Sequence, residues 1–118
     1  MTRVKITIPQ ANIADFCQRH HIRKLALFGS VLRDDFRPDS DIDVLVEFEP
    51  GHVPGFIRLA GMELELSELL GRRKVDMNTP MGLSPYFRDE VLAEAEVVYV
   101  GAFSKLIEYQ PFGGFDRR

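Results

Sequence analysis

Cysteine is nearly absent from this chain. Cys17 is its one cysteine, so no disulfide can form within the chain. No apolar run approaches the roughly 20 residues that a membrane-spanning helix needs. Residues 1–9 alternate apolar and polar side chains, a pattern that differs from a secretory signal peptide. These absences predict a soluble protein of the reducing cytoplasm, with no membrane partner.

An excess of positive charge is also missing. The chain has 15 Lys and Arg residues against 18 Asp and Glu residues, for a net charge of −3. A protein that coats DNA or RNA neutralises phosphates with a surplus of basic side chains. A mildly acidic chain is therefore not expected to bind nucleic acid directly.

The length and composition are those of one small globular domain. The chain has 118 residues, of which 45% are hydrophobic and 28% are charged, enough to build a single core. Strand-like and helix-like segments alternate, which predicts an α/β (α+β) fold with helices packed on a sheet. We expect this domain to span residues 1–101. Residues 102–118 form a C-terminal tail, which is aromatic but broken by Pro and Gly and is expected to contact another protein.

Apolar periodicity and turn residues predict the individual elements. The expected strands are residues 4–8, 24–29, 41–49, 74–78 and 97–100. The expected helices are one capped by Asn12 and ending near residues 20–21, one over residues 56–70 with Gly71 as a left-handed cap, and one over residues 84–95. A short helical turn is expected to begin at Ser30.

The expected helix over residues 56–70 is apolar around well over half of its circumference. Such a helix either lies deep in the core or carries surplus apolar surface. In a chain of this size we favour surplus surface, covered by another protein.

A pair of carboxylates on the expected strand 41–49 is the first sign of chemistry. Asp41 and Asp43 are two residues apart, so both point to one face, about 6.6 Å apart along the strand. The strand is otherwise apolar, and charges there are costly unless something positive compensates them. Carboxylates of this kind suit Mg²⁺, which binds through a few carboxylates and substrate phosphates. The alternative is a solvent-facing pair at the start of a strand.

The turn at Gly29-Ser30 is a candidate phosphate site. Glycine lets the backbone approach a ligand, and the free amides and the Ser30 hydroxyl can hold phosphate oxygens. Arg33 lies one turn further on and either adds positive charge there or pairs with a nearby aspartate (Asp34, Asp35 or Asp39). Asp76 is a third carboxylate, on the expected strand 74–78. Three carboxylates beside a phosphate site match a two-metal phosphoryl-transfer centre.

The spacing Gly29-Ser30, ten residues, then Asp41-x-Asp43 resembles the G-S-x(10)-D-x-D signature of the DNA polymerase β-like nucleotidyltransferases. Residues 3–100 look like the minimal nucleotidyltransferases of that superfamily, which commonly act as antitoxins to a HEPN-domain ribonuclease toxin. The resemblance implies a mixed β-sheet with helices packed on it. It also implies that the protein forms an oligomer or a hetero-complex.

The resemblance also implies roles for single residues. Asp41 and Asp43 bind two Mg²⁺ ions, and Asp76 completes the metal site or acts as the base. ATP binding is assigned to Gly29, Ser30, Arg33 and Ser40. Ser40 also fits a purely structural role in shaping the turn. The implied reaction transfers AMP from ATP to a hydroxyl of the toxin, a tyrosine in this subgroup, and releases pyrophosphate.

Two other functions stay open. An antitoxin could neutralise its partner by binding alone, or the enzyme could modify a small molecule such as an aminoglycoside. The latter usually needs a further acceptor-binding domain.

Other polar clusters have simpler interpretations. One helix end holds Cys17, His20 and His21, which could suggest a zinc site. Because no second pair of ligands occurs elsewhere, we favour packing of Cys17 in the core over zinc binding. His52, in a Pro/Gly loop, is expected to be exposed. Residues 72–74 (Arg-Arg-Lys) are expected to form a solvated turn. The alternative is a contact with a nucleotide or a partner.

Overall fold

The computed structural model describes residues 4–101 of the chain. The prediction for the C-terminal tail, 102–118, lies outside the described residues. The elements are α1 (Gln10–Arg19), β1 (Ile22–Phe28), the 3₁₀ turn η1 (Gly29–Leu32), β2 (Ile42–Phe48), α2 (Phe56–Leu69), β3 (Val75–Asn78), the 3₁₀ turn η2 (Pro80–Gly82), α3 (Arg88–Glu94) and β4 (Glu96–Val100).

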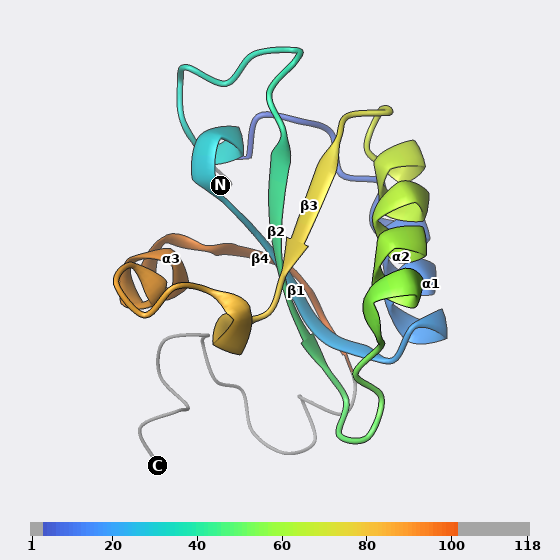
Figure 1. Ribbon diagram of the computed structural model, residues 1–118. Coiled ribbons are helices and arrows are strands. Elements are labelled where there is room, and N and C mark those ends of the chain that lie inside the picture. Colours follow the sequence, from blue (N-terminus) through green and yellow to red (C-terminus); the bar gives the residue numbers. More distant parts are fainter. Residues whose placement is uncertain (1–3, 102–118) are drawn as a thin grey trace.

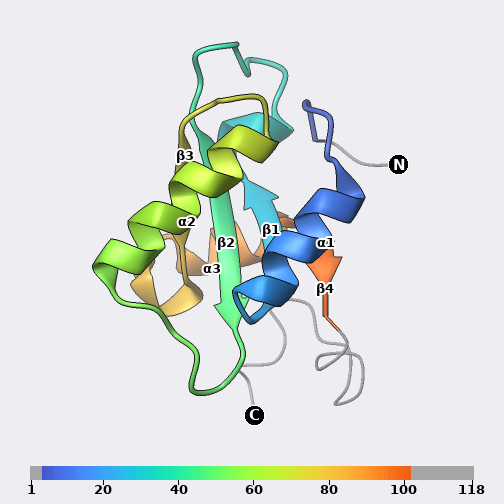
Figure 2. The same cartoon turned by 90° about the vertical axis from the view of Figure 1, so that its right-hand side faces the viewer.

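The strands form one mixed sheet in the order β3-β2-β1-β4. β1 pairs antiparallel with β2 and β4, whereas β2 and β3 run parallel. α1 and α2 lie side by side on one face of the sheet, and α3 lies on the opposite face (Figures 1 and 2). This arrangement confirms the predicted α/β class with a mixed sheet. None of the helices in residues 4–101 is long and apolar enough to cross a membrane.

The alternation along β2 sends its side chains into two separate cores. Ile42, Val44 and Val46 belong to the larger core, which also holds the buried residues of α1 and α2. Leu45 belongs to the smaller core, together with buried residues of α3. Because successive side chains of a strand point to opposite faces, Asp43 is on the α3 side of the sheet. The predicted division of this strand into two faces is therefore confirmed.

Residues 4–8 do not form the predicted strand. Their backbone reaches η1 through a hydrogen bond from the Lys5 N–H to the Val31 carbonyl, at 3.0 Å. Val4, Ile6 and Ile8 still pack, partly buried, against the larger core. The apolar pattern thus reflects packing of an extended segment that pairs with no strand within residues 4–101.

Two helix starts also differ from the prediction. α1 begins at Gln10 after Pro9, so Asn12 lies inside the helix and is not its cap. α3 begins at Arg88, four residues later than expected. Ser84 explains the delay, because its hydroxyl accepts the Tyr86 N–H at 3.3 Å and its carbonyl accepts the Phe87 N–H at 3.2 Å. A serine that bonds the backbone in this way favours a turn over a helix.

α2 carries the surplus apolar surface that its composition predicts. Met62 and Leu66 are its buried residues, whereas Phe56 and Ile57 are 92% and 91% exposed. A deep position in the core is therefore wrong for this helix. It ends as expected, with Gly71 in the left-handed region at φ +85°.

Candidate active site

The sheet register brings the predicted site residues together from three strands. Asp43 of β2 lies opposite Phe28, the last residue of β1, and beside Asp76 of β3. Gly29 directly follows Phe28, and Asp41 lies one residue before β2. Residues that are 47 positions apart in sequence are thus neighbours at one end of the sheet.

Glycine is required at position 29 for two reasons. Gly29 has φ +77°, in the left-handed region that residues with a side chain rarely adopt. A Cβ atom placed on Gly29 would also overlap Oδ2 of Asp43. The backbone turn and the carboxylate can therefore approach each other only because no side chain stands between them.

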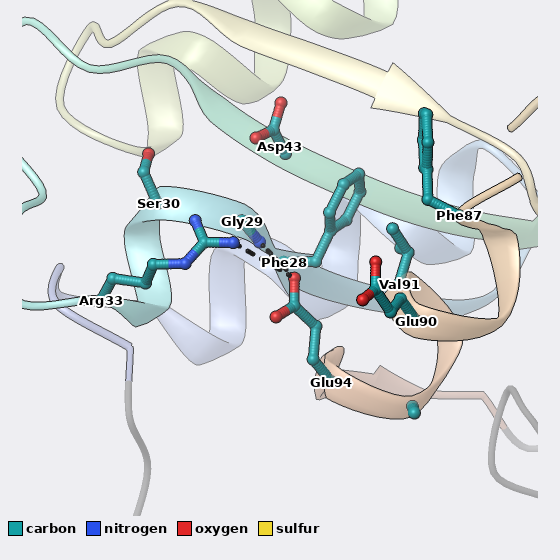
Figure 3. A pocket seen from close by; sticks show the side chains of 10 residues that line it. Phe28, Gly29, Ser30, Arg33, Asp43, Phe87, Glu90, Val91 and Glu94 are labelled. Atoms are coloured by element: carbon teal, nitrogen blue, oxygen red, sulfur yellow. Dashed lines mark hydrogen bonds and ion pairs between the residues drawn. The ribbon is translucent and has the colours of Figure 1, made fainter. Parts of the chain in front are cut away.

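A cavity of about 720 Å³ opens in front of this turn. Figure 3 shows its lining from β1, η1, β2 and α3. The lining residues are Phe28, Gly29, Ser30, Arg33, Asp43, Phe87, Glu90, Val91, Ala93 and Glu94. Four predicted site residues are therefore in the cavity wall, and Asp76 and Asp41 flank Asp43 beside it.

The negative charges of Asp41, Asp43 and Asp76 repel one another when no cation lies between them. Burial raises the pKa of Asp43, the negative charges of Asp76 and Asp41 raise it further, and the positive charge of Arg33 opposes the shift. Lys74 Nζ lies 4.0 Å from Asp41 Oδ2, but that ammonium is largely exposed. Three oxygen-donor side chains in mutual repulsion form a donor set that fits Mg²⁺, a hard cation that prefers oxygen.

Glu94 is a residue of the cavity that the sequence analysis did not single out. Its Oε2 accepts a hydrogen bond from the Gly29 N–H at 3.2 Å and lies 3.9 Å from Nη2 of Arg33 (Figure 3). Arg33 thus faces the cavity, and Asp34, one of its alternative partners, pairs with Lys5. No local motif marks Glu94, because its contact with Gly29 spans 65 residues.

Ser40 lies in the turn that precedes Asp41 and does not line the cavity. Its hydroxyl accepts the Arg37 N–H at 3.0 Å. Arg73 holds the same turn from outside, since its Nη1 donates to the carbonyls of Arg37 and Pro38 at 3.2 and 3.0 Å. The basic segment 72–74 therefore contributes a residue that positions the loop before Asp41, which the sequence analysis missed.

The candidate zinc ligands at the end of α1 and just after it are separated by the fold. Cys17 is buried in the larger core, and burial raises the pKa of its thiol to about 12. His20 Nε2 contacts Glu65 Oε1 at 2.9 Å. His21 and His52 lie together elsewhere, and His52 is exposed as predicted.

A family model and a named relative assign this chain to the same kind of protein. Residues 11–98 match the nucleotidyltransferase domain family. The protein adenylyltransferase MntA of Thermococcus cleftensis is 35% identical over 94 residues, which cover 80% of this chain and 90% of the relative.

Solved structures share the fold. One that is assigned to the minimal nucleotidyltransferases is 41% identical, with a TM-score of 0.59, and the match covers 73% of this chain and 85% of that one. A toxin–antitoxin structure with AMP-PNP has a TM-score of 0.66 over 90% of this chain and 82% of its own, but at 16% identity it supports the fold alone. The chain therefore belongs to the nucleotidyltransferase domain family and is a minimal nucleotidyltransferase enzyme.

Proposed function

We propose that this enzyme is a Mg²⁺-dependent protein adenylyltransferase that acts as an antitoxin. It transfers AMP from ATP to the hydroxyl of a tyrosine in a HEPN-domain ribonuclease toxin. The observation that carries the proposal is the contact of Asp43 with Gly29, which places a carboxylate against a backbone turn suited to phosphate. The name of the Thermococcus relative supports the choice of AMP and of a protein acceptor.

Asp41, Asp43 and Asp76 would hold two Mg²⁺ ions. When bound, the metal neutralises negative charge on the phosphates and makes the α-phosphorus more open to attack. The three neighbouring carboxylates offer oxygen ligands at the edge of the cavity, where a triphosphate can complete the coordination.

The chain's own groups would bind and orient the nucleotide. The Ser30 hydroxyl and the amides of η1 donate to oxygens of the β- and γ-phosphates, and the Arg33 guanidinium adds a positive charge beside them. The oxygen of the acceptor hydroxyl forms a bond to the α-phosphorus while the bond from that phosphorus to pyrophosphate breaks. The hydroxyl proton passes to the carboxylate of Asp76, and pyrophosphate leaves.

The exposed apolar side chains along α2 and in the loop before it are the proposed contact surface for the toxin. Phe56 and Ile57 are almost fully exposed, and Val53 and Leu64 are each 72% exposed. Adjacent apolar side chains of this kind often mark a protein interface. Ile57→Glu is expected to weaken association with the toxin while leaving ATP binding unchanged.

The test is transfer of label from α-³²P-ATP to the purified HEPN toxin in the presence of Mg²⁺. We expect label on one toxin tyrosine and release of pyrophosphate. The matched control is the double variant Asp41→Asn, Asp43→Asn, which should bind the toxin but not label it. Absence of label with the wild-type protein, under conditions where the two proteins associate, would refute the proposed reaction.

The binding-only antitoxin is distinguished by the same double variant. If that variant neutralises the toxin in cells as well as the wild type does, neutralisation occurs by occlusion and catalysis is not used. If toxicity returns, transfer is required. Melting curves add a test of the nucleotide site, because Mg²⁺ and ATP together should raise the melting temperature more than the two single shifts summed.

A further inference from the structure

A second group of metal-ligating side chains lies at the end of the sheet remote from the cavity. His21 directly precedes β1, Glu49 directly follows β2, and His52 is three residues further on. One ligand atom from each of these residues lies within 4.8 Å of the others. Since Gly29 is at the opposite end of β1, the group is on the order of 25 Å from the proposed active site.

Backbone hydrogen bonds hold the three residues in place. The Glu49 N–H donates to the His21 carbonyl at 2.8 Å, and the His52 N–H donates to the Glu49 carbonyl at 3.0 Å. Gly51, at φ +82°, makes the turn between them. His21 itself has φ +57°, a conformation that is uncommon for a residue with a side chain. The backbone thus presents two imidazoles and one carboxylate from two segments that are far apart in sequence.

The side chains already contact one another. His21 Nδ1 lies 3.5 Å from Glu49 Oε1, and the rings of His21 and His52 stack with their centroids 3.8 Å apart and an angle of 17° between their planes. His20, the neighbour of His21, bonds Glu65 instead. Glu49 is half-buried and His52 is exposed, so both can turn toward a common ion without disturbing the core.

We propose that His21, Glu49 and His52 bind one divalent transition-metal ion of the zinc class, with water completing its coordination. Two imidazoles and a carboxylate form a donor set that suits Zn²⁺, whereas Mg²⁺ prefers oxygen ligands alone. The lone pair of a ring nitrogen lies in the plane of its ring, and the two ring planes are nearly parallel. Binding of one ion therefore requires the two rings to leave their stacked arrangement.

The ion would join the loop after β2 to the start of β1. That loop, 49–55, leads directly into α2, whose first residues, Phe56 and Ile57, are exposed. A metal bridge between two backbone segments restricts the motion of the loop. The site is therefore structural, and it is separate from the carboxylates at Gly29.

The test uses the untagged full-length protein, since an affinity tag rich in histidine would itself bind zinc. Zn²⁺ is titrated calorimetrically in an excess of Mg²⁺, which occupies sites built from carboxylates alone. The variants are His52→Ala, Glu49→Gln and His21→Asn, the last chosen because asparagine tolerates the left-handed backbone. His20→Gln is the matched control, because it removes the remaining histidine and keeps a side chain that can bond Glu65.

We expect one Zn²⁺ per wild-type chain and a loss of affinity of roughly tenfold or more in each of the three variants. His20→Gln should bind as the wild type does. In NMR spectra, the imidazole signals of His21 and His52 should move on addition of Zn²⁺, and those of His20 should not. Unchanged affinity in His52→Ala, whose exposed loop position makes misfolding no concern, would overturn the proposal. An absence of Zn²⁺ binding to the wild type would also overturn it. The cluster would then be only a stacked pair of histidines beside Glu49.

Discussion

Oδ2 of Asp43 lies so close to the backbone of Gly29 that a methyl group on Gly29 would overlap it. One residue supplies a turn that only glycine adopts readily, and the other supplies a half-buried carboxylate beside two further carboxylates. This relationship joins the end of β1 to β2 in the candidate active site, and the first predictions test it.

Gly29→Ala is expected to lower both stability and nucleotide transfer. The left-handed backbone costs an L-residue about 1–2 kcal/mol, and the new methyl group would displace the Asp43 carboxylate. Gly71→Ala is the matched control, because Gly71 has φ +85° and no atom of the described residues lies within 4 Å of an added Cβ. We expect Gly71→Ala to lose stability by thermal melting but to keep its transfer rate. Equal transfer rates in the two variants would contradict the role of the contact.

Asp43→Asn is expected to abolish transfer without destabilising the metal-free protein. Burial and the charges of Asp76 and Asp41 raise the pKa of Asp43, so its ionised form costs folding free energy above that raised pKa. Removing the charge should leave the melting temperature unchanged or higher at neutral pH in the presence of a chelator.

The advantage of Asp43→Asn should shrink as the pH falls through the raised pKa, because the wild-type carboxyl then becomes neutral as well. Asp35→Asn, an exposed aspartate in the loop before β2, controls for the loss of one negative charge. A marked drop in melting temperature for Asp43→Asn alone would argue that the carboxylate is a structural group.

Glu94→Gln is expected to tighten ATP binding severalfold. Glu94 presents a negative carboxylate to the Gly29 N–H and to Arg33, which are the groups proposed to bind phosphates. Glutamine keeps an acceptor for that N–H and removes the repulsion of the triphosphate. Glu90→Gln, on the same cavity wall, changes the net charge equally. Calorimetric titration with the non-hydrolysed analogue AMP-PNP should show the larger gain for Glu94→Gln, and equal gains would indicate a general charge effect only.

Glu65 should make the stability depend on pH in the acid range. Its hydrogen bond with Arg19 lowers the pKa of this carboxyl, and a second bond with His20 adds to the effect. The stabilisation is therefore present above the ordinary glutamate pKa of about 4.3 and is lost as the pH falls through the lowered pKa. Urea unfolding of Glu65→Gln should show a loss of stability at neutral pH that disappears in acid. Glu68, on the same helix as Glu65, makes an exposed ion pair with Arg72. Glu68→Gln, which removes that pair, should change little at either pH.

The alternation of side chains along β2 and the spacing of Gly29-Ser30 from Asp41-x-Asp43 predicted most of the residues that the structure brings together in the candidate site. These features depend on short-range geometry. The period of a strand decides which face a side chain points to, and only glycine adopts the turn at position 29 without cost. The same kind of pattern was misleading at residues 4–8, where alternation reflects packing against the core rather than pairing with a strand.

The tertiary structure alone decided the contacts that span the chain. Glu94 reaches Gly29 because α3 packs on the Asp43 face of the sheet, and Arg73 holds the turn before Asp41 because β3 lies parallel to β2. His21 meets His52 because the start of β1 lies beside the end of β2 in the antiparallel pair. The residues in each pair are separated by about 30 or more positions, so no local pattern couples them. Their meeting depends on strand order and on the face that each helix covers, which the free energy of the whole packed core determines.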